Sequence, residues 1–352
     1  MCGKKWNFEP TKPLFVGLIN GGIFMTKFDY EIDDFMTYCS SKDLSKKTKR
    51  SYEQTLRLFA KYLEDVENVT SSKEVTREMI NNYIVYLKER GKYTITSNEN
   101  SIKYNKPSNR TDYDKPIQNV TINNYVRNLK VYFNFMADSY LIRVNPMAKT
   151  KFLKASRKKK AFLSDEDFTK LIKGMDTSKY AEYRDSVVIQ LIFDTGMRVG
   201  ETLLIDVTTD IDFQNRAINL RAEITKAKIA RTVFFSYRTA EILKRWIKYK
   251  DRYVESNLLF PVQVRDKALE VNNFEKNYRK YCERVGITEF SPHGLRNNFA
   301  KRFLMNGGDI YTLSRILGHS SVKVTEEYYL DLTDEDLRKN YQKFSPMMRL
   351  RA

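Results

Sequence analysis

The sequence predicts a mainly α-helical fold with one small antiparallel β-sheet in the C-terminal half, in a chain of two domains. Three observations support this prediction. Apolar residues recur at helical spacing in the first half, whereas around residues 210–235 they alternate in the manner of strands. Residues 145–162 combine a proline with a dense block of Lys and Arg, which is typical of a domain boundary. A length of 352 residues also agrees with about two domains.

The N-terminal domain is predicted over residues 26–144, and residues 1–25 are predicted to form a dispensable leader. Four segments of this domain place apolar residues on one helical face. These residues are Phe28, Ile32, Phe35, Met36 and Cys39; Tyr52, Leu56, Phe59, Leu63 and Val66; Met79, Ile80, Tyr83, Ile84 and Leu87; and Ile122, Val126, Leu129, Phe133 and Met136. Gly91 is predicted as the C-cap of the third helix and Thr121 as the N-cap of the fourth.

Two polar segments interrupt these patterns. Residues 92–118 are rich in Asn, Ser and Lys, have no helical period and exceed an ordinary connection in length. This insert is either a functional loop or a disordered one, and we expect it to be mobile when unbound. The basic linker at residues 145–162 is either a solvated connection or a segment whose positive side chains lie along a phosphate backbone.

The C-terminal domain is predicted over residues 163–332, beginning with a helix capped by Ser164. A buried helix, two strands joined by a hairpin region, and further helices follow. Their ranges are 183–196 for the buried helix, 210–220 and 230–236 for the strands, 221–229 for the hairpin region, and 241–254 and 272–286 for the next helices. Residues 333–352 form a tail, in which Leu332, Leu337, Tyr341 and Phe344 could line one side of a short helix.

The charge of the chain points to a polyanionic partner. Lys and Arg number 62 against 44 Asp and Glu, which gives a net charge of +18. Such an excess on a folded protein is most simply explained by nucleic-acid binding, although it also aids solubility. Three widely spaced cysteines suggest neither disulfides nor a thiolate metal site and fit a reducing, cytoplasmic setting. The longest apolar stretch, residues 13–25, is too short to span a membrane.

Only two histidines occur in the chain, and both lie in unusual local sequence. His293 stands in "SPHGLRNNFA", three residues before Arg296, and His319 stands in "RILGHSS". Without nearby carboxylate or cysteine spacing they make a poor zinc site, so no metal is expected. Arg198 lies between glycines in "DTGMRVGE" at the end of the buried helix, where an arginine is costly unless an anion or a carboxylate meets it. Lys226 lies near the tip of the strand connection.

Taken in order, "TGMRVGE", "HGLRNNFA" and "LGHSS" followed by a tyrosine resemble the tyrosine recombinases, the phage-type integrase and Xer-like family of site-specific DNA recombinases. The resemblance covers residues 163–332 by motif and residues 28–136 by helical pattern. It implies a two-domain clamp around double-stranded DNA with specific recombination sites. It further implies a homotetramer on DNA, to which a directionality factor can be added, and chemistry without cofactor, metal or ATP.

The resemblance also assigns roles. Arg198 and Arg296 would hold the non-bridging oxygens of the scissile phosphate, since a guanidinium donates in pairs and stays charged. Lys226 would give a proton to the leaving 5′ oxygen. His293 would accept the proton of the nucleophile, and His319 would donate a hydrogen bond to the phosphate as charge builds.

The nucleophile of the family lies nine positions after the motif histidine, which is Tyr328 and not its neighbour Tyr329. Helical phase alone does not separate the two, because neighbours differ by about 100° and either could face the phosphate. Lys228 remains an alternative to Lys226 if the hairpin register differs. Asn297 departs from the histidine that many members carry after the motif arginine, which blurs the subfamily.

The resemblance implies a recombinase that cleaves and rejoins DNA through a covalent 3′-phosphotyrosine, acting as the integrase or transposase of a mobile element. The long insert at residues 92–118 favours this role over a compact Xer-like resolvase of chromosome or plasmid dimers. A type IB topoisomerase and a non-catalytic DNA-binding regulator are further alternatives. The tail would dock on a neighbouring protomer or pack on its own domain.

Overall fold

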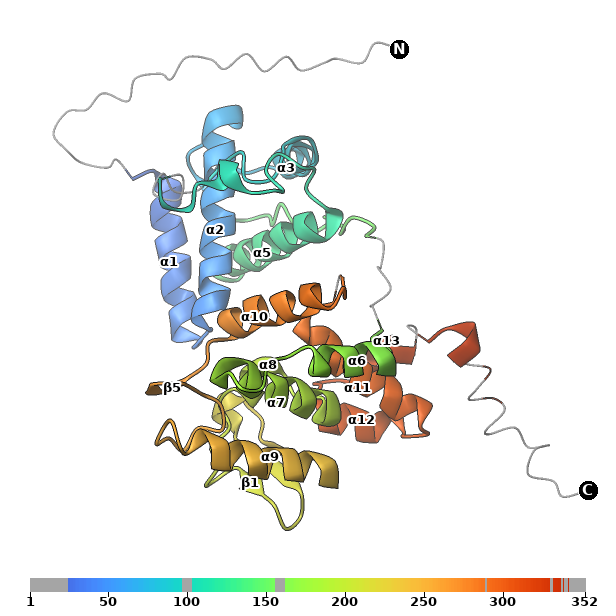
Figure 1. Ribbon diagram of the computed structural model, residues 1–352. Coiled ribbons are helices and arrows are strands. Elements are labelled where there is room, and N and C mark those ends of the chain that lie inside the picture. Colours follow the sequence, from blue (N-terminus) through green and yellow to red (C-terminus); the bar gives the residue numbers. More distant parts are fainter. Residues whose placement is uncertain are drawn as a thin grey trace, which may run out of the picture. The chain divides into compact units, whose positions relative to one another are not determined.

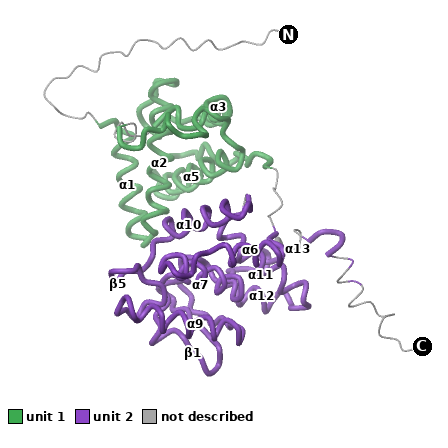
Figure 2. Tube along the Cα trace, in the orientation of Figure 1, with its two compact units in different colours: residues 1–157 green, residues 158–352 purple. Residues whose placement is uncertain are grey.

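The computed structural model describes residues 25–96, 103–155, 162–288, 290–329, 332–336, 338 and 341, without the side chains of residues 327–329. The chain divides into two compact units, residues 1–157 and 158–352 (Figure 2). Apart from Met25, the predicted leader lies outside the described residues. Most of the described chain is helical, and its strands form small antiparallel sheets, so the predicted fold class is confirmed.

The first unit is a group of helices around one apolar core (Figure 1). Its elements are α1 (Lys27–Ser41), α2 (Lys46–Tyr62), η1 (Leu63–Glu67), η2 (Ser72–Glu74), α3 (Arg77–Glu89), η3 (Pro107–Asn109) and α5 (Asn119–Asp138). The hydroxyls of Thr26, Ser45 and Thr76 accept hydrogen bonds from backbone N–H groups in the first turns of α1, α2 and α3. These caps satisfy donors that have no partner within the helix and so fix where each helix begins.

The four predicted apolar faces are buried or half-buried, with one exception. Val66 is 44% exposed, because α2 passes into the π-helical η1 and the chain then turns at Asn68, where φ is 54°. Two predicted caps are wrong. Arg90, and not Gly91, is the C-cap of α3, and α5 begins beyond Gln118, before Thr121.

The two ends of the insert at residues 92–118 lie side by side. Gly91 forms an antiparallel bridge with Pro116, and the backbone N–H of Lys92 donates to the Lys115 carbonyl at 2.9 Å. A Cβ on Gly91 would meet the backbone of Asp114 at 2.6 Å, so this close approach requires glycine. The stem of the insert is therefore closed, and its residues 97–102 lie outside the described residues.

The segment after α5 packs on the first unit. Met147 is buried in its core, and the backbone N–H of Leu153 donates to the Asn123 side chain at 2.8 Å. The Asn123 amide donates in return to the Leu153 carbonyl at 2.9 Å. Met147 and Leu153, in the early part of the basic segment 145–162, thus pack on this unit, while residues 156–161 lie outside the described residues.

The second unit is built around the buried helix α7, which packs against α9, α10 and α11 (Figure 1). Its helices are α6 (Asp165–Lys173), α7 (Tyr180–Thr195), α8 (Val199–Thr202), η4 (Ala222–Ile224), α9 (Tyr237–Lys250), α10 (Val271–Arg284), α11 (Pro292–Met305), α12 (Ile310–Leu317) and α13 (Val322–Tyr329). Its strands are β1 (Ile211–Asp212), β2 (Ala217–Leu220), β3 (Arg231–Phe234), β4 (Pro261–Val262) and β5 (Arg265–Ala268). Ser164 caps α6 as predicted.

The strands form two antiparallel sheets, one more than predicted. β1, β2 and β3 lie in sequence order, and the register pairs Leu220 with Arg231 and Ala217 with Phe234. The short β4 and β5 form a separate hairpin. Among the described residues, no helix is long and apolar enough to cross a membrane.

Candidate active site

Arg198 stands at the junction between two helices. α7 ends at Gly196, whose φ of 68° is left-handed and favours glycine. A Cβ there would also lie 2.3 Å from the Phe299 ring. Two residues on, Arg198 is the N-cap of α8, and its guanidinium donates to Glu201 Oε1 at 2.8 Å and to the Gly318 carbonyl at 3.4 Å. About a quarter of its side chain, 27%, is exposed.

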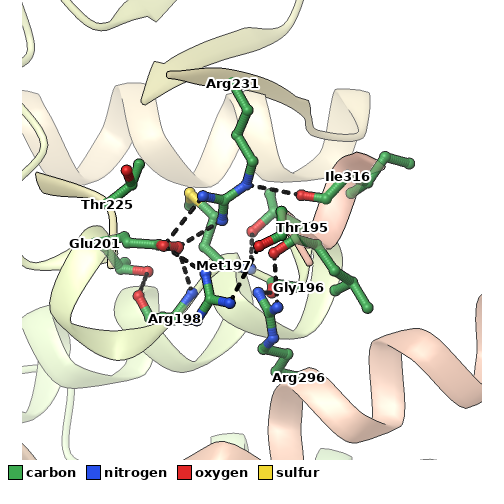
Figure 3. A network of polar contacts seen from close by, with 12 residues as sticks. Thr195, Gly196, Met197, Arg198, Glu201, Thr225, Arg231, Arg296 and Ile316 are labelled. Carbon is green, nitrogen blue, oxygen red and sulfur yellow. Dashed lines mark hydrogen bonds and ion pairs between the residues drawn. The ribbon is translucent and has the colours of Figure 1, made fainter. Parts of the chain in front are cut away.

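Glu201 is a buried carboxylate shared by two arginines (Figure 3). Besides Arg198, it accepts hydrogen bonds from Nη1 and Nη2 of Arg231, at 3.1 and 2.6 Å. Burial acts to raise the pKa of Glu201, but the hydrogen bonds and charges of Arg231 and the contacts of Arg198 outweigh it and hold the pKa below its ordinary value. Glu201 is therefore an ionised anchor for both guanidinium groups.

Arg296, on α11, has a side chain that is almost completely buried, with 2% of the residue exposed. Its Nη1 donates to the Gly196 carbonyl and its Nη2 to the Leu317 carbonyl, each at 2.7 Å. These carbonyls stand at the C-terminal ends of α7 and α12, where the helix dipole favours a cation. Two helix ends thus compensate the buried positive charge.

His319 follows Gly318, the left-handed C-cap of α12 with a φ of 63°. Its Nε2 lies 3.0 Å from Arg296 Nη2, and its Nδ1 lies 2.8 Å from the hydroxyl of Thr325. Since an arginine can only donate, Nε2 is the acceptor and the neutral ring carries its proton on Nδ1. Burial, followed by the charges of Arg296, Arg198, Arg231 and His293, lowers the pKa of His319 to about 4.

The structure brings Arg198, Arg296 and His319 together from three distant parts of the sequence. Arg198 and His319 line a cleft of about 670 Å³, which we call the Arg198 cleft. Thr225, Ala227, Ile229, Arg231 and Gly318 also line it. Lys226 lies between two of these residues, in the connection from η4 to β3, and is exposed, as is Lys228.

The remaining two predicted residues lie on helices. His293 is exposed on the first turn of α11, close enough for its charge to act on His319. Tyr328 lies on α13 with Tyr329, but the side chains of both are outside the described residues. Within the described ranges, no group of three or more His, Cys, Asp or Glu could hold a metal ion.

Known families match both halves of the chain. Residues 161–336 match the phage integrase family, and residues 32–102 match the N-terminal SAM-like domain of phage integrases. The chain is a tyrosine recombinase of the phage integrase family. The resemblance read from the three motifs is therefore confirmed, and the recombinase is an enzyme.

Curated relatives of the recombinase are Xer proteins. It is 24% identical over 313 residues to tyrosine recombinase XerC of Pediococcus pentosaceus, covering 87% of this chain and 94% of the relative. It is 26% identical over 321 residues to XerD of Lacticaseibacillus casei, covering 90% and 98%. It is also 30% identical over 215 residues to XerA of Saccharolobus solfataricus, covering 60% and 66%.

Solved structures share the fold of the recombinase at low identity. The Tn1549 transposon integrase in complex with a circular intermediate DNA has a TM-score of 0.68 at 17% identity and covers 91% of this chain and 100% of its own. A lambda integrase dimer bound to a core site has a TM-score of 0.60 at 14% identity, covering 85% and 76%. These likenesses establish the same architecture.

Sequence reasoning missed Glu201, Arg231 and Thr325 as parts of the recombinase site. Glu201 stood within the quoted motif "TGMRVGE", three residues after an arginine on a predicted helix end, and that spacing was a usable signal. Arg231 and Thr325 gave no comparable signal. Their partners, Glu201 and His319, are recognisable only after the chain has folded.

Proposed function

We propose that the recombinase cleaves and rejoins specific DNA sites through a covalent 3′-phosphotyrosine on Tyr328, without metal or ATP. The observation that carries the proposal is that Arg198 and His319 line the Arg198 cleft while the buried Arg296 contacts His319. A cluster of two guanidinium groups and an imidazole fits a phosphodiester whose negative charge grows as the nucleophile attacks. The net charge of +18 would bring the DNA to it.

Arg198 is the group best placed to meet phosphate oxygens directly, because part of its side chain is exposed at the cleft. Arg296 is buried and contacts His319, so its positive charge would act on the phosphate beside that imidazole. A bound phosphate, as an acceptor, could take the hydrogen bond that Arg296 Nη2 gives to His319 in this structure. The phosphate charge would also favour a protonated His319, which could then donate to the same oxygen.

The proposed reaction exchanges one ester for another. The phenolic oxygen of Tyr328 attacks phosphorus, and its proton passes to His293 as general base. The bond from phosphorus to the 5′ oxygen breaks, and Lys226 supplies the proton that this oxygen takes up. The phosphotyrosine retains an ester of similar energy, so a DNA hydroxyl can reverse the step without ATP.

We propose that residues 163–332 form the catalytic domain and residues 26–144 a DNA-binding domain, with the insert and basic linker adding DNA contacts. The working form would be a homotetramer on two sites, assisted where required by a directionality factor. In the tail, Asp336 forms an ion pair with Lys301 of its own unit at 2.6 Å, and Leu337 and Phe344 lie outside the described residues. Docking on a neighbouring protomer would therefore fall to residues beyond Asp336.

Integration or excision of a mobile element is the role we propose first, because the closed insert at residues 92–118 lengthens the DNA-binding domain. Resolution of chromosome or plasmid dimers is the second candidate. It is favoured by the XerC and XerD relatives, which align over 87% and 90% of the chain.

A suicide-substrate experiment tests the proposed chemistry. The purified chain would be incubated with nicked duplexes made from the DNA that flanks its own gene, with EDTA present and ATP absent. We expect a covalent adduct that survives denaturation and maps to Tyr328. Specific binding without any adduct would favour the DNA-binding regulator, and relaxation of supercoiled DNA that lacks a site would favour the topoisomerase.

A further inference from the structure

Arg231 joins three separate segments of the second unit (Figure 3). It is the first residue of β3, it donates through both terminal nitrogens to Glu201 of α8, and its Nε donates to the Ile316 carbonyl of α12 at 2.9 Å. Only 9% of its side chain is exposed. A planar guanidinium is suited to this task because its fork can bind a carboxylate in two places while Nε binds elsewhere.

The α12 contact lies beside the motif that carries His319. Gly318 packs so closely on Arg231 that a Cβ there would lie 2.8 Å from Cδ and 2.9 Å from Nε of the arginine. The positive φ of Gly318 and this contact both require glycine at the position. Arg231 therefore fixes β3 against the turn from which His319 emerges.

The same arginine also closes the loop that carries Lys226. Leu220 pairs with Arg231 in the sheet, so residues 221–230 form the connection between β2 and β3. Within it, the Thr225 hydroxyl donates to the Ala222 and Ile229 carbonyls, each at 3.0 Å, and accepts from the Ile229 N–H at 3.1 Å. These bonds hold the loop together internally, whereas Arg231 binds its end to Glu201 of α8 and to the Ile316 carbonyl of α12.

We propose that Arg231 is a positioning residue that sets Lys226 against the scissile phosphate by fastening the loop 221–230 to Glu201 and α12. The inference rests on the proposed function. Arg198 does not depend on Arg231 for its own anchor, because Glu201 still accepts from its guanidinium and its backbone N–H, at 2.8 and 3.0 Å. Loss of Arg231 should thus impair the leaving-group proton more than phosphate binding.

The test compares two DNA substrates, one with the natural 5′ oxygen as the leaving atom and one with sulfur in its place. A thiolate leaves without a proton, so the sulfur substrate does not need Lys226. For Arg231→Gln we expect single-turnover cleavage of the oxygen substrate to slow about 100-fold, as for a misplaced catalytic group. Cleavage of the sulfur substrate should approach the rate of the unaltered chain, and DNA affinity should change little. Arg231→Lys keeps the charge but loses the fork, and should show a smaller defect with the same selectivity.

Arg221→Gln is the matched control. Arg221 lies at the start of the same loop and binds a buried carboxylate, Asp210, through Nε at 2.9 Å and Nη2 at 3.2 Å. Its side chain binds Asp210 and the Leu204 carbonyl and not Glu201 or α12, the anchors of Arg231, so we expect equal effects on both substrates. Thermal unfolding of each variant would separate a folding defect, which slows both substrates alike, from a positioning defect.

Equal slowing of Arg231→Gln on the oxygen and sulfur substrates would overturn the proposal, because Arg231 would then serve the phosphate or the fold in general. If the unaltered chain forms no covalent adduct with either substrate, the proposed function itself fails. The two failures are therefore distinguishable.

Discussion

Arg296 Nη2 donates a hydrogen bond to His319 Nε2 over 3.0 Å, which places a buried guanidinium directly behind a neutral imidazole. The other ring nitrogen donates to Thr325, a buried residue of α13. His319 thus connects α11, which carries Arg296, with the helix that carries Tyr328. The imidazole is held from both sides before any DNA is bound.

The burial of His319 beside Arg296 predicts a loss of stability in mild acid. The pKa of His319 is lowered to about 4 in the folded chain from 6.5, mainly by burial, so the folded state resists protonation. The stability advantage of the neutral ring is complete above pH 6.5 and is lost as the pH falls towards 4. We expect the unfolding free energy, relative to that of His319→Gln, to fall by roughly 2 kcal/mol over this interval, allowing for partial solvent screening.

Urea titrations at several pH values would measure this difference. His293→Gln serves as the control because it removes the other histidine, which is exposed. This control should keep most of the decline of the unaltered chain, because the His293 charge is the smallest of the causes that lower the pKa of His319. A constant difference between the unaltered chain and His319→Gln from pH 7 to 4 would contradict the lowered pKa.

Thr325→Val should weaken the link between His319 and α13. The substitution keeps the buried shape but removes the hydroxyl that accepts from Nδ1 at 2.8 Å. Loss of one hydrogen bond, about 1 kcal/mol, should slow covalent attachment by about 10-fold or less, with DNA binding retained. Thr169→Val, at an exposed position on α6, should leave the rate unchanged. Equal rates for the two variants would show that the link does not matter.

The helical faces could be predicted because their signal is local. Phe28, Ile32 and Phe35 are buried on α1 as their spacing requires. The prediction that Val66 is buried was wrong because the α-helical period ends in η1, just before the turn at Asn68. Counting the period in the sequence assumes that the α-helix continues. The second sheet was missed because β4 has only two residues, too few to show an alternation.

The candidate site could be read only in part. The motifs brought Arg198, Arg296 and His319 to attention through a family resemblance, and not through any local physical rule. The pairing of Glu201 with Arg231 was not readable, because Arg231 lies 30 positions after Glu201 and meets it only in the folded unit. Ion pairs between distant residues have no sequence period, so the folded chain has to supply them.

Glu201→Gln should cost stability. Glu201 is ionised between Arg198 and Arg231, and its removal leaves the nearly buried Arg231 without a counter-charge. Breaking such a pair from one side costs about 3 kcal/mol or more. Because its pKa is lowered, the stability from Glu201 is complete above its ordinary pKa and is lost as the pH falls below it.

Chemical denaturation at pH 7 and at lower pH would measure the effect of Glu201→Gln. The expected destabilisation is largest at pH 7 and shrinks in acid. Glu223→Gln, at an exposed position in η4, is the control and should change stability by less than about 0.5 kcal/mol. Similar stabilities for the two variants at pH 7 would argue against the anchor.

The two lysines of the loop can be separated by substitution. Lys226 lies between the cleft residues Thr225 and Ala227, and Lys228, with a φ of 55°, lies between Ala227 and Ile229, so placement alone does not decide between them. If Lys226 is the general acid, Lys226→Met should slow cleavage of the oxygen substrate by about 100-fold or more, and sulfur should restore it. Lys228→Met should cleave both substrates at nearly the unaltered rate. The reverse pattern would transfer the role to Lys228.

The tyrosine doublet gives the most direct test of the chemistry. Tyr328 and Tyr329 are neighbours on α13, and successive positions of an α-helix are about 100° apart, so only one of the two positions suits attack on a given phosphate. The bond from Thr325 to His319 sets the rotation of this helix about its axis. Tyr328 and Tyr329 stand three and four positions after Thr325, about 60° to one side and about 40° to the other, so helical phase does not separate them. The preference for Tyr328 rests on its position nine residues after His319, which is where the family resemblance places the nucleophile.

We therefore expect Tyr328→Phe to abolish the covalent adduct on a suicide substrate while DNA affinity stays within about 2-fold, since a single phenolic hydroxyl adds little to a phosphate-dominated interface. Tyr329→Phe should form the adduct at a rate close to that of the unaltered chain. Mass spectrometry of the trapped peptide would identify the modified residue independently. An adduct that persists in Tyr328→Phe and disappears in Tyr329→Phe would reverse the assignment.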